Sequence, residues 1–190
     1  MTKTKVLIVY TTIFGNTQKM AEAIATGAKS VSDTEASVLS AEDATEEEVL
    51  DCDALILGTP THMSSCDWRM KEFIDRVCGQ LWIKDRAIGK VGAAFATGGG
   101  FGNAGGGCQS AMMDLLNNLA EMGMILIPLP KNTPGYASGG LQWGAYGRSA
   151  GKNMEQTGVK DEMFEAAKHH GANVARAASV LKEATIFINS

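Results

Sequence analysis

Apolar runs bounded by turn residues alternate along the chain with stretches in which apolar positions recur every three or four residues. A continuous apolar run is typical of a strand covered on both faces, and the second pattern is typical of an amphipathic helix. The strand candidates are residues 5–10, 35–39, 54–57, 91–96 and 124–129. This alternation predicts an α/β protein built on a parallel sheet.

The helical stretches between these runs each carry one apolar face. The faces consist of Met20, Ile24 and Ala28; of Met70, Phe73, Ile74 and Val77; and of Met112, Leu115, Leu116 and Leu119. Thr45 and Glu48 have the spacing of a capping box and predict a short helix ahead of the third strand. A last helix is expected within residues 159–183. Because neither a linker nor an internal repeat interrupts the pattern, we expect a single domain over residues 1–190.

Residues 130–158 break the alternation, since they are rich in glycine and show little periodicity. Loops of this length inside a domain are usually functional or disordered. The segment also carries Trp143 and Tyr146, and these aromatic side chains favour a functional loop.

Composition narrows the classes of function. The 190 residues are 45% hydrophobic and 20% charged, with a formal net charge of -4 and no block of Lys or Arg, which argues against a nucleic-acid or anionic-membrane surface. The first apolar run is too short for a signal peptide or a membrane span, so we expect a cytoplasmic protein without membrane insertion. The four cysteines form no CxxC pair and have no histidine at ligand spacing, so we expect neither a metal site nor disulfides.

The first strand runs through a turn rich in hydroxyl groups directly into a helix. Such a turn presents backbone N–H groups and the positive end of the helix dipole, to which Thr12 and Thr17 can add hydroxyl donors. It predicts a site for a phosphate monoester that needs no Lys or Arg. A plain helix start capped by Asn16 or Thr17 is the structural alternative.

Tyr10, Thr12, Gly15 and Thr17, at this spacing after an apolar strand, resemble the loop with which flavodoxins hold the phosphate of FMN. The resemblance implies a flavodoxin-like three-layer sandwich with a five-stranded parallel sheet in the order 2-1-3-4-5. It also implies that FMN is contacted by Thr12, Ile13, Phe14, Gly15, Asn16 and Thr17. A receiver domain would need an acidic pair at the end of the first strand, and a Walker-type loop would need a lysine after Gly15; the chain has neither.

The third strand ends in Gly58-Thr59-Pro60-Thr61, which resembles a loop of the WrbA-type NAD(P)H:quinone oxidoreductases, a flavodoxin-like family. In that family the loop lies along the isoalloxazine ring, which implies FMN contacts from Pro60, Thr61, His62, Met63 and Ser64. His62 and Met63 replace the arginine and phenylalanine that the family usually has there.

The fourth strand is followed by a glycine-rich stretch that literally contains GxGxxG at Gly100, Gly102 and Gly105. We reject a dinucleotide fingerprint, because the next strand candidate is followed by Pro130 and not by an acidic residue that would bind ribose. The resemblance implies instead that backbone amides approach FMN along Thr97, Gly98, Gly99, Gly100 and Phe101.

Two further segments resemble the oxidoreductase family. Gly79-Gln80-Leu81-Trp82 is similar to its Gly-Gly-Leu-Trp, and Trp143-Gly144-Ala145 is similar to the Tyr-Gly-Ala of a loop that closes over a neighbouring subunit's flavin. The resemblance implies a substrate face made of His62, Trp82 and, from another subunit, Trp143, and hence a homo-oligomer, either a dimer or a tetramer. Glu121 and Met122 replace family histidines, so one family contact is missing.

The expected function is therefore FMN-dependent transfer of two electrons from NADH or NADPH to a quinone. A flavodoxin that carries single electrons is the first alternative. The modest net charge and the long loop of this chain argue against a carrier. An FMN-binding scaffold without catalysis is the second.

Overall fold

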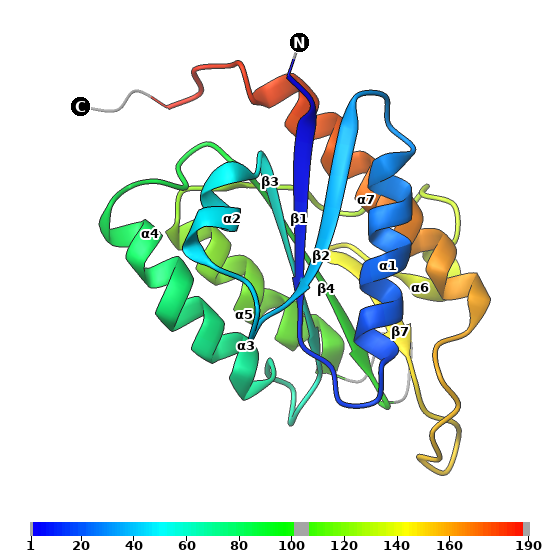
Figure 1. Ribbon diagram of the computed structural model, residues 1–190. Helices are drawn as coiled ribbons and strands as arrows, with labels where there is room; N and C mark the ends of the chain where they lie inside the picture. The colour runs from blue at the N-terminus through cyan, green and yellow to red at the C-terminus, as the bar shows by residue number, and fades with distance from the viewer. Residues whose placement is uncertain (1, 101–106, 188–190) are drawn as a thin grey trace.

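A computed structural model describes residues 2–100 and 107–187. A mostly parallel sheet lies between two layers of helices (Figure 1). The strands are β1 (Thr4–Tyr10), β2 (Thr34–Ser40), β3 (Ala54–Pro60), β4 (Val91–Gly98), β5 (Ile125–Leu126), β6 (Gly140–Leu141) and β7 (Gly144–Arg148). The helices are α1 (Asn16–Lys29), α2 (Glu46–Asp51), α3 (Trp68–Phe73), the π-helical turn η1 (Ile74–Cys78), α4 (Gly79–Ile83), α5 (Cys108–Glu121), α6 (Tyr136–Gly139) and α7 (Asp161–Leu181).

The two faces of the sheet are covered by different helices, as Figure 1 shows. Side chains alternate along β1, so Val6 and Ile8 pack under α1 and α7, whereas Leu7 and Val9 face the layer of α2, α3, η1, α4 and α5. All the apolar positions that predicted the three crossover helices are buried. The capping box of Thr45 and Glu48 is present at the start of α2, and α7 occupies the place of the predicted last helix.

The sheet order is β2-β1-β3-β4-β7-β6, with β6 antiparallel to β7 and β5 paired with the start of β4. The predicted order is confirmed through the fourth strand. The predicted fifth strand at residues 124–129 pairs in parallel with β4 as expected, but only Ile125–Leu126 form it, and β7 takes the position beside the rest of β4. The described residues form seven strands instead of the predicted five, because β5 and β7 share the place of the fifth strand beside β4 and β6 is added.

Proline explains where the fifth strand stops. Pro128 has no N–H to donate to a strand ladder, so the chain leaves the sheet two residues after β5. The chain comes back beside β4 at Gly144. A β-carbon there would lie 2.0 Å from the carbonyl oxygen of Ala94, so only glycine permits this approach of β7 to β4.

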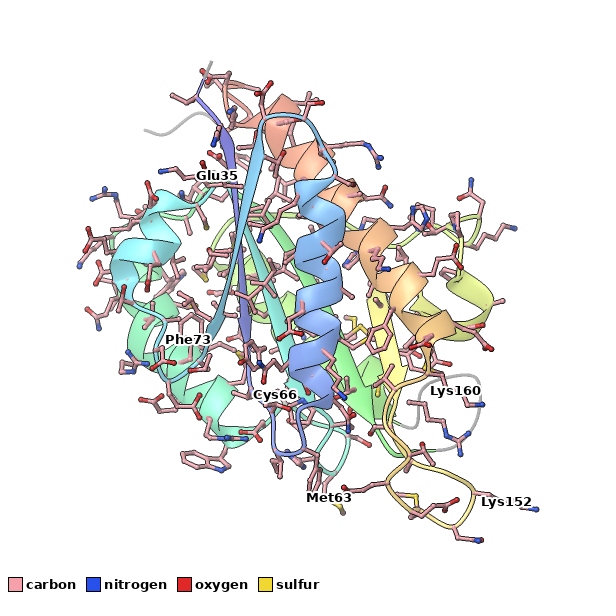
Figure 2. All side chains as sticks on the ribbon, turned by 45° about the vertical axis from the view of Figure 1, so that its right-hand side comes forward. Glu35, Met63, Cys66, Phe73, Lys152 and Lys160 are labelled. Carbon is pink, nitrogen blue, oxygen red and sulfur yellow. The ribbon has the colours of Figure 1, made fainter. Side chains whose placement is uncertain are left out.

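The segment 130–158 is thus not one loop. It contains α6, β6 and β7, and only the part after β7 reaches the carboxyl edge of the sheet. Figure 2 shows Lys152 of this part and Met63 of the loop after β3 at the same end of the molecule. Of the helices in the described ranges, none combines the length and apolar character needed to cross a membrane.

Candidate functional site

The largest group of predicted site residues meets at the carboxyl ends of β1, β3 and β4, where an open α/β sheet places its ligands. A cavity of about 250 Å³ lies there. It is lined by Thr12, Ile13, Phe14, Asn16, Thr17, Pro60, Thr61, His62, Thr97, Gly98, Gly99, Ser149, Ala150, Met154 and Gln156. Three loops that are distant in sequence therefore line one cavity.

The loop between β1 and α1 supplies the hydroxyl groups. Gly15 precedes the helix in a left-handed conformation with φ of 78°, which turns the chain so that Asn16 and Thr17 begin α1 at the cavity. Gly15 itself shapes this turn and is not part of the cavity wall. Thr17 is buried, and its Oγ1 shares a hydrogen bond of 2.7 Å with Oγ1 of Thr97 at the end of β4. This hydrogen bond joins the loop between β1 and α1 to the end of β4.

Gly98 at the end of β4 and Gly99 directly after it line the cavity, and neither position has room for a side chain. A β-carbon on Gly98 would lie 2.9 Å from Sγ of Cys108, and one on Gly99 would lie 2.9 Å from Cε of Met154. Larger residues would fill the cavity or push its walls apart. Gly100 does not line the cavity, and Phe101 lies outside the described residues.

The loop after β3 divides into residues that line the cavity and residues that do not. Pro60, Thr61 and His62 line it, whereas Met63 is fully exposed and Ser64 lies outside the lining. Both of the latter have positive φ, 49° and 65°, in a tight turn closed by the bridge between His62 and Ser65. This turn sends Met63 outward (Figure 2).

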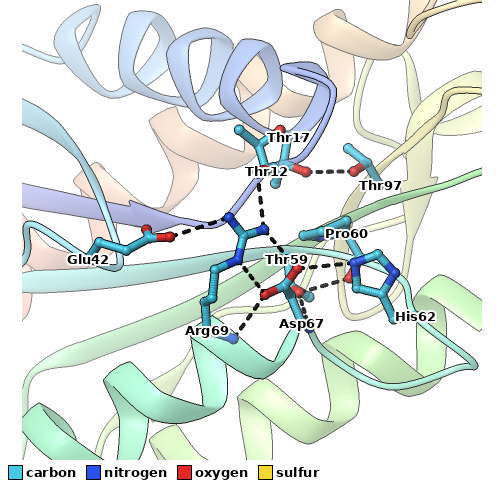
Figure 3. Close-up of polar contacts among 9 residues, drawn as sticks. All are labelled: Thr12, Thr17, Glu42, Thr59, Pro60, His62, Asp67, Arg69 and Thr97. Atoms are coloured by element: carbon cyan, nitrogen blue, oxygen red, sulfur yellow. Dashed lines mark hydrogen bonds and ion pairs between the residues drawn. The ribbon is translucent and has the colours of Figure 1, made fainter.

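A polar network that the sequence did not predict supports His62 (Figure 3). The carboxylate of Asp67, on a residue only 1% exposed, accepts hydrogen bonds from the backbone N–H, Nε and Nη2 of Arg69, each 2.9 Å long. Its Oδ2 also lies 3.1 Å from Nε2 of His62. Arg69 donates further to the backbone oxygen of Thr12 at 3.2 Å and to Glu42 at 3.3 Å. The network therefore links the loop after β3 to the loop between β1 and α1.

Arg69 keeps the buried carboxyl group of Asp67 ionised. Burial by itself would raise the pKa of Asp67, but the hydrogen bonds and charge of Arg69 outweigh it and lower that pKa below its usual value. Asp67 is thus a carboxylate at neutral pH. His62 is the one ionisable side chain among the described residues that line the cavity.

Ser149, Ala150, Met154 and Gln156 are lining residues that sequence reasoning missed. They follow β7, a short strand with glycine at two of its five positions, whose sequence shows no strand pattern. Asp67 was missed because an aspartate two residues before an arginine at a helix start resembles an ordinary N-cap, a role that it also fills.

The structure does not bring Trp82 or Trp143 to the cavity of the same chain. Trp82 is half exposed on α4, beside Glu121 and Met122 at the end of α5. Trp143 is partly buried against the core at the turn between β6 and β7. The next residue, Gly144, pairs with Ala94, four positions before the end of β4, which places it about 13 Å from the carboxyl edge. The sequence assigned only Trp143 to a neighbouring subunit, and that role stays a prediction. Trp82 was expected at the substrate face without a neighbour, and it does not line the cavity of its own chain.

The cysteines have no place in the chemistry of this cavity. Cys52, Cys78 and Cys108 are buried free thiols, and burial raises the pKa of Cys108 to about 11. A thiol with such a pKa is not a nucleophile at neutral pH. Thr61 donates a hydrogen bond of 3.2 Å to Cys108, which packs behind Gly98.

The lining fits a ligand with one phosphate and a flat polar ring. The N-terminus of α1 and the hydroxyl groups of Thr12 and Thr17 suit a phosphate in the absence of any lining Lys or Arg among the described residues. Gly98 and Gly99 give backbone access, and Pro60 and Thr61 offer a wall of mixed polarity. FMN has both of these chemical parts.

Comparison with known proteins identifies the family. Residues 8–141 match the family model described as flavodoxin. A protein of Paraburkholderia phymatum named NAD(P)H dehydrogenase (quinone) is 32% identical over 93% of this chain and 98% of its own length. A protein of Aquifex aeolicus named flavodoxin is 43% identical over 122 residues, which are 64% of this chain and 63% of that protein.

Solved structures show the same fold. A flavodoxin, WrbA-like protein from Agrobacterium tumefaciens superimposes with a TM-score of 0.69 at 22% identity, over 94% of this chain and 99% of that one. A flavodoxin from the domain Archaea gives a TM-score of 0.67 at 23% identity, over 92% and 99% of the two chains. The chain therefore belongs to the flavodoxin family, whose cofactor is FMN.

Proposed function

We propose that this chain is a cytoplasmic, single-domain oxidoreductase that uses FMN to transfer two electrons from NADH or NADPH to a quinone. The observation that carries the proposal is the similarity to the Paraburkholderia phymatum protein named NAD(P)H dehydrogenase (quinone), which extends over nearly all of both chains. A Rhizobium meliloti protein with a corresponding name is 29% identical over 94% of each chain.

The cavity residues divide the binding of FMN among them. Thr12, Thr17 and the first turn of α1 would hold the phosphate, while Gly98 and Gly99 admit the rest of the cofactor to the backbone of β4. Pro60, Thr61 and His62 would bound the ring. When bound, FMN supplies the redox chemistry by accepting hydride from a nicotinamide and passing the electrons to an acceptor.

Apolar side chains at the cavity suit flat ring substrates. Ile13, Phe14 and Met154 line the cavity yet are 56%, 65% and 56% exposed, so their outer surfaces are open to an incoming molecule. Large exposed apolar side chains grouped at a cavity are typical of binding surfaces. Packed against a nicotinamide or quinone ring, these side chains would exclude water from the reacting atoms.

The alternative function is that of a flavodoxin that carries single electrons between proteins. The Aquifex aeolicus protein named flavodoxin favours it, because its identity over the matched part is higher. That match covers less than two thirds of either chain, however, and the full-length match is to an enzyme.

The test begins with the purified full-length protein, which is expected to be yellow and to release FMN on denaturation. With NADH or NADPH it should reduce a soluble benzoquinone over many turnovers, and anaerobic potentiometry should give a single two-electron step. Two well-separated one-electron steps without NAD(P)H-driven turnover would support the carrier and reject the oxidoreductase. A colourless protein that binds no added FMN would reject both.

We also propose that the enzyme is a homo-oligomer, a dimer or a tetramer, in which Trp143 and Trp82 approach the cavity of a neighbouring chain. Both side chains lie away from the cavity of their own chain, and Trp82 is half exposed. Sizing chromatography should show a multiple of the 20.0 kDa chain mass. Trp82→Ala should lower quinone turnover while FMN affinity is kept. A fully active monomer would reject the shared site.

A further inference from the structure

The carboxylate of Asp67 is more than a helix cap. Capping needs one acceptor for the backbone N–H of Arg69, which serine, threonine or asparagine would provide without burying a charge. Burying a carboxylate is costly unless it is paired and hydrogen-bonded. Here the guanidinium of Arg69 supplies the pairing through both carboxylate oxygens, and Oδ2, which accepts from Nη2 of Arg69, also contacts Nε2 of His62. The charge is thus retained at a place where a neutral cap would be simpler.

The contact to Asp67 sets which nitrogen of His62 carries a proton. An ionised carboxylate only accepts hydrogen bonds, so Nε2, at 3.1 Å from Oδ2, must be the N–H donor. The other ring nitrogen, Nδ1, has no hydrogen-bond partner within residues 2–100 and 107–187. Nδ1 is therefore the atom of His62 that remains available to a ligand, as acceptor when the ring is neutral and as donor when it is protonated.

Among the described lining residues, His62 has the one side chain that can act as a general acid. The other lining side chains of the described residues are apolar, hydroxyl or amide groups. The charged groups that face His62 are Asp67 directly and, behind it, Arg69 with its second partner Glu42. The side chain of His62 is 44% exposed, so it can exchange protons with solvent.

We propose that Asp67 is a positioning residue for proton delivery: it holds His62 through Nε2 so that Nδ1 donates the proton that reduction of a quinone requires. The proposal rests on the proposed function and deepens it. NAD(P)H provides a hydride, which is two electrons and one proton, and a hydroquinone contains two protons. The second comes from Nδ1–H of His62: this N–H bond breaks, an O–H bond forms on the quinone oxygen, and the neutral ring regains a proton from solvent.

The choice of electron acceptor separates proton delivery from electron transfer. Ferricyanide takes up electrons without protons, so its reduction needs no donor at Nδ1. His62→Gln is expected to lower kcat with a benzoquinone by about 100-fold, in the range of general-acid catalysis, and Asp67→Asn by about tenfold, because the ring is still present. The ratio of the benzoquinone rate to the ferricyanide rate, measured at saturating FMN, should therefore fall about 100-fold in His62→Gln and about tenfold in Asp67→Asn, whatever either change does to FMN binding. Asp75→Asn, which removes an exposed carboxylate paired with Lys71 on the same helical run, is the matched control and should change neither rate.

A double variant shows whether Asp67 acts through His62. With quinone, Asp67→Asn/His62→Gln should be no slower than His62→Gln alone, since the residue being positioned is already absent. A further loss in the double variant would overturn the positioning role. His62→Gln leaves the Asp67–Arg69 pair intact, so it remains informative if Asp67→Asn does not fold.

Nitrogen-15 spectra of the full chain, with and without FMN, provide a readout that does not depend on turnover. The chain has three histidines, so His62 is assigned by its loss in His62→Gln. At a pH at which the ring is neutral, its proton should reside on Nε2 in the wild type, and this preference should weaken in Asp67→Asn. A wild-type proton on Nδ1 would overturn the proposal.

The two hypotheses fail in different ways. If the wild type oxidises NAD(P)H with neither acceptor, the proposed function fails and proton delivery fails with it. If the wild type reduces both acceptors and the two variants slow both equally, only the role of Asp67 and His62 in proton delivery is rejected.

Discussion

His170 makes the stability of this protein sensitive to mild acid. It lies on α7 and is 0% exposed, and within the described part of the chain neither ring nitrogen makes a hydrogen bond of normal geometry. Burial disfavours the charged ring and outweighs the opposing influence of the Ala94 backbone, which lowers the pKa of His170 from 6.5 to about 4. The folded state therefore holds this ring neutral at a pH at which the unfolded chain would protonate it.

The direction of the effect follows from the two pKa values. Above pH 6.5 the ring is neutral in both states and costs nothing, and as the pH falls below 6.5 the unfolded state gains a proton that the folded state accepts only near pH 4. Between pH 7.5 and pH 5.0 the free energy of unfolding should fall by about 2 kcal/mol from this residue alone. Most carboxylates protonate at lower pH, so this window separates the titration of histidine from theirs.

Urea unfolding of the FMN-free protein at the two pH values measures this loss. His170→Leu, which keeps the volume and removes the titrating ring, should reduce the loss by about 2 kcal/mol. His169→Leu is the matched control, because His169 is adjacent to His170 on the same helix but is only partly buried. This variant should keep the wild-type loss of stability. Equal losses in His170→Leu and the wild type would refute the reasoning.

Three other changes test the site and one helix end. Thr17→Ala should weaken FMN binding in a fluorescence titration by about 1–3 kcal/mol, the range for a hydrogen bond to a charged group. Thr26→Ala, on the exposed side of the same helix, should leave the affinity unchanged. Equal affinities of the two variants would remove Thr17 from the phosphate site. Gly99→Val should abolish FMN binding with unchanged helix content by circular dichroism, because its β-carbon would lie 2.9 Å from the side chain of Met154. At Gly79 the atom nearest to an added β-carbon is 3.8 Å away, so Gly79→Ala should bind FMN normally. Glu48→Ala breaks the capping box and should cost about 1 kcal/mol in chemical denaturation; no loss would mean that the box adds nothing to α2.

The sequence predicts those strands that are buried on both faces. Residues of β1, β3 and β4 must be apolar whichever way they point, so their continuous runs are visible without any knowledge of neighbours. β7 has the sequence Gly-Ala-Tyr-Gly-Arg, because close packing on β4 requires small residues at its start, and this reads as a turn. The divided fifth strand therefore escaped prediction for a steric reason.

The candidate site was predictable where a loop is local and not where it depends on distant packing. Thr12 to Thr17 form their turn within one strand-to-helix connection, so spacing alone identifies it. Met154 and Gln156 reach the cavity only because β7 aligns with β4. The pairing of Asp67 with His62 likewise depends on a tight turn at Met63 and Ser64, whose positive φ values carry no clear sequence signal.

The two borders of the sheet restrict how copies of this protein can associate. On one side the sheet ends at β6, which is only two residues long and too short to template pairing with another strand. On the other side it ends at β2, where Glu35 points outward and forms an ion pair with Lys3, so an approaching strand would have to desolvate charges (Figure 2). Sheets of neighbouring molecules are thus kept from merging into one continuous sheet. Any assembly must instead use helical surfaces or the loops around the cavity, and these are the elements whose side chains can contribute to a neighbour's chemistry.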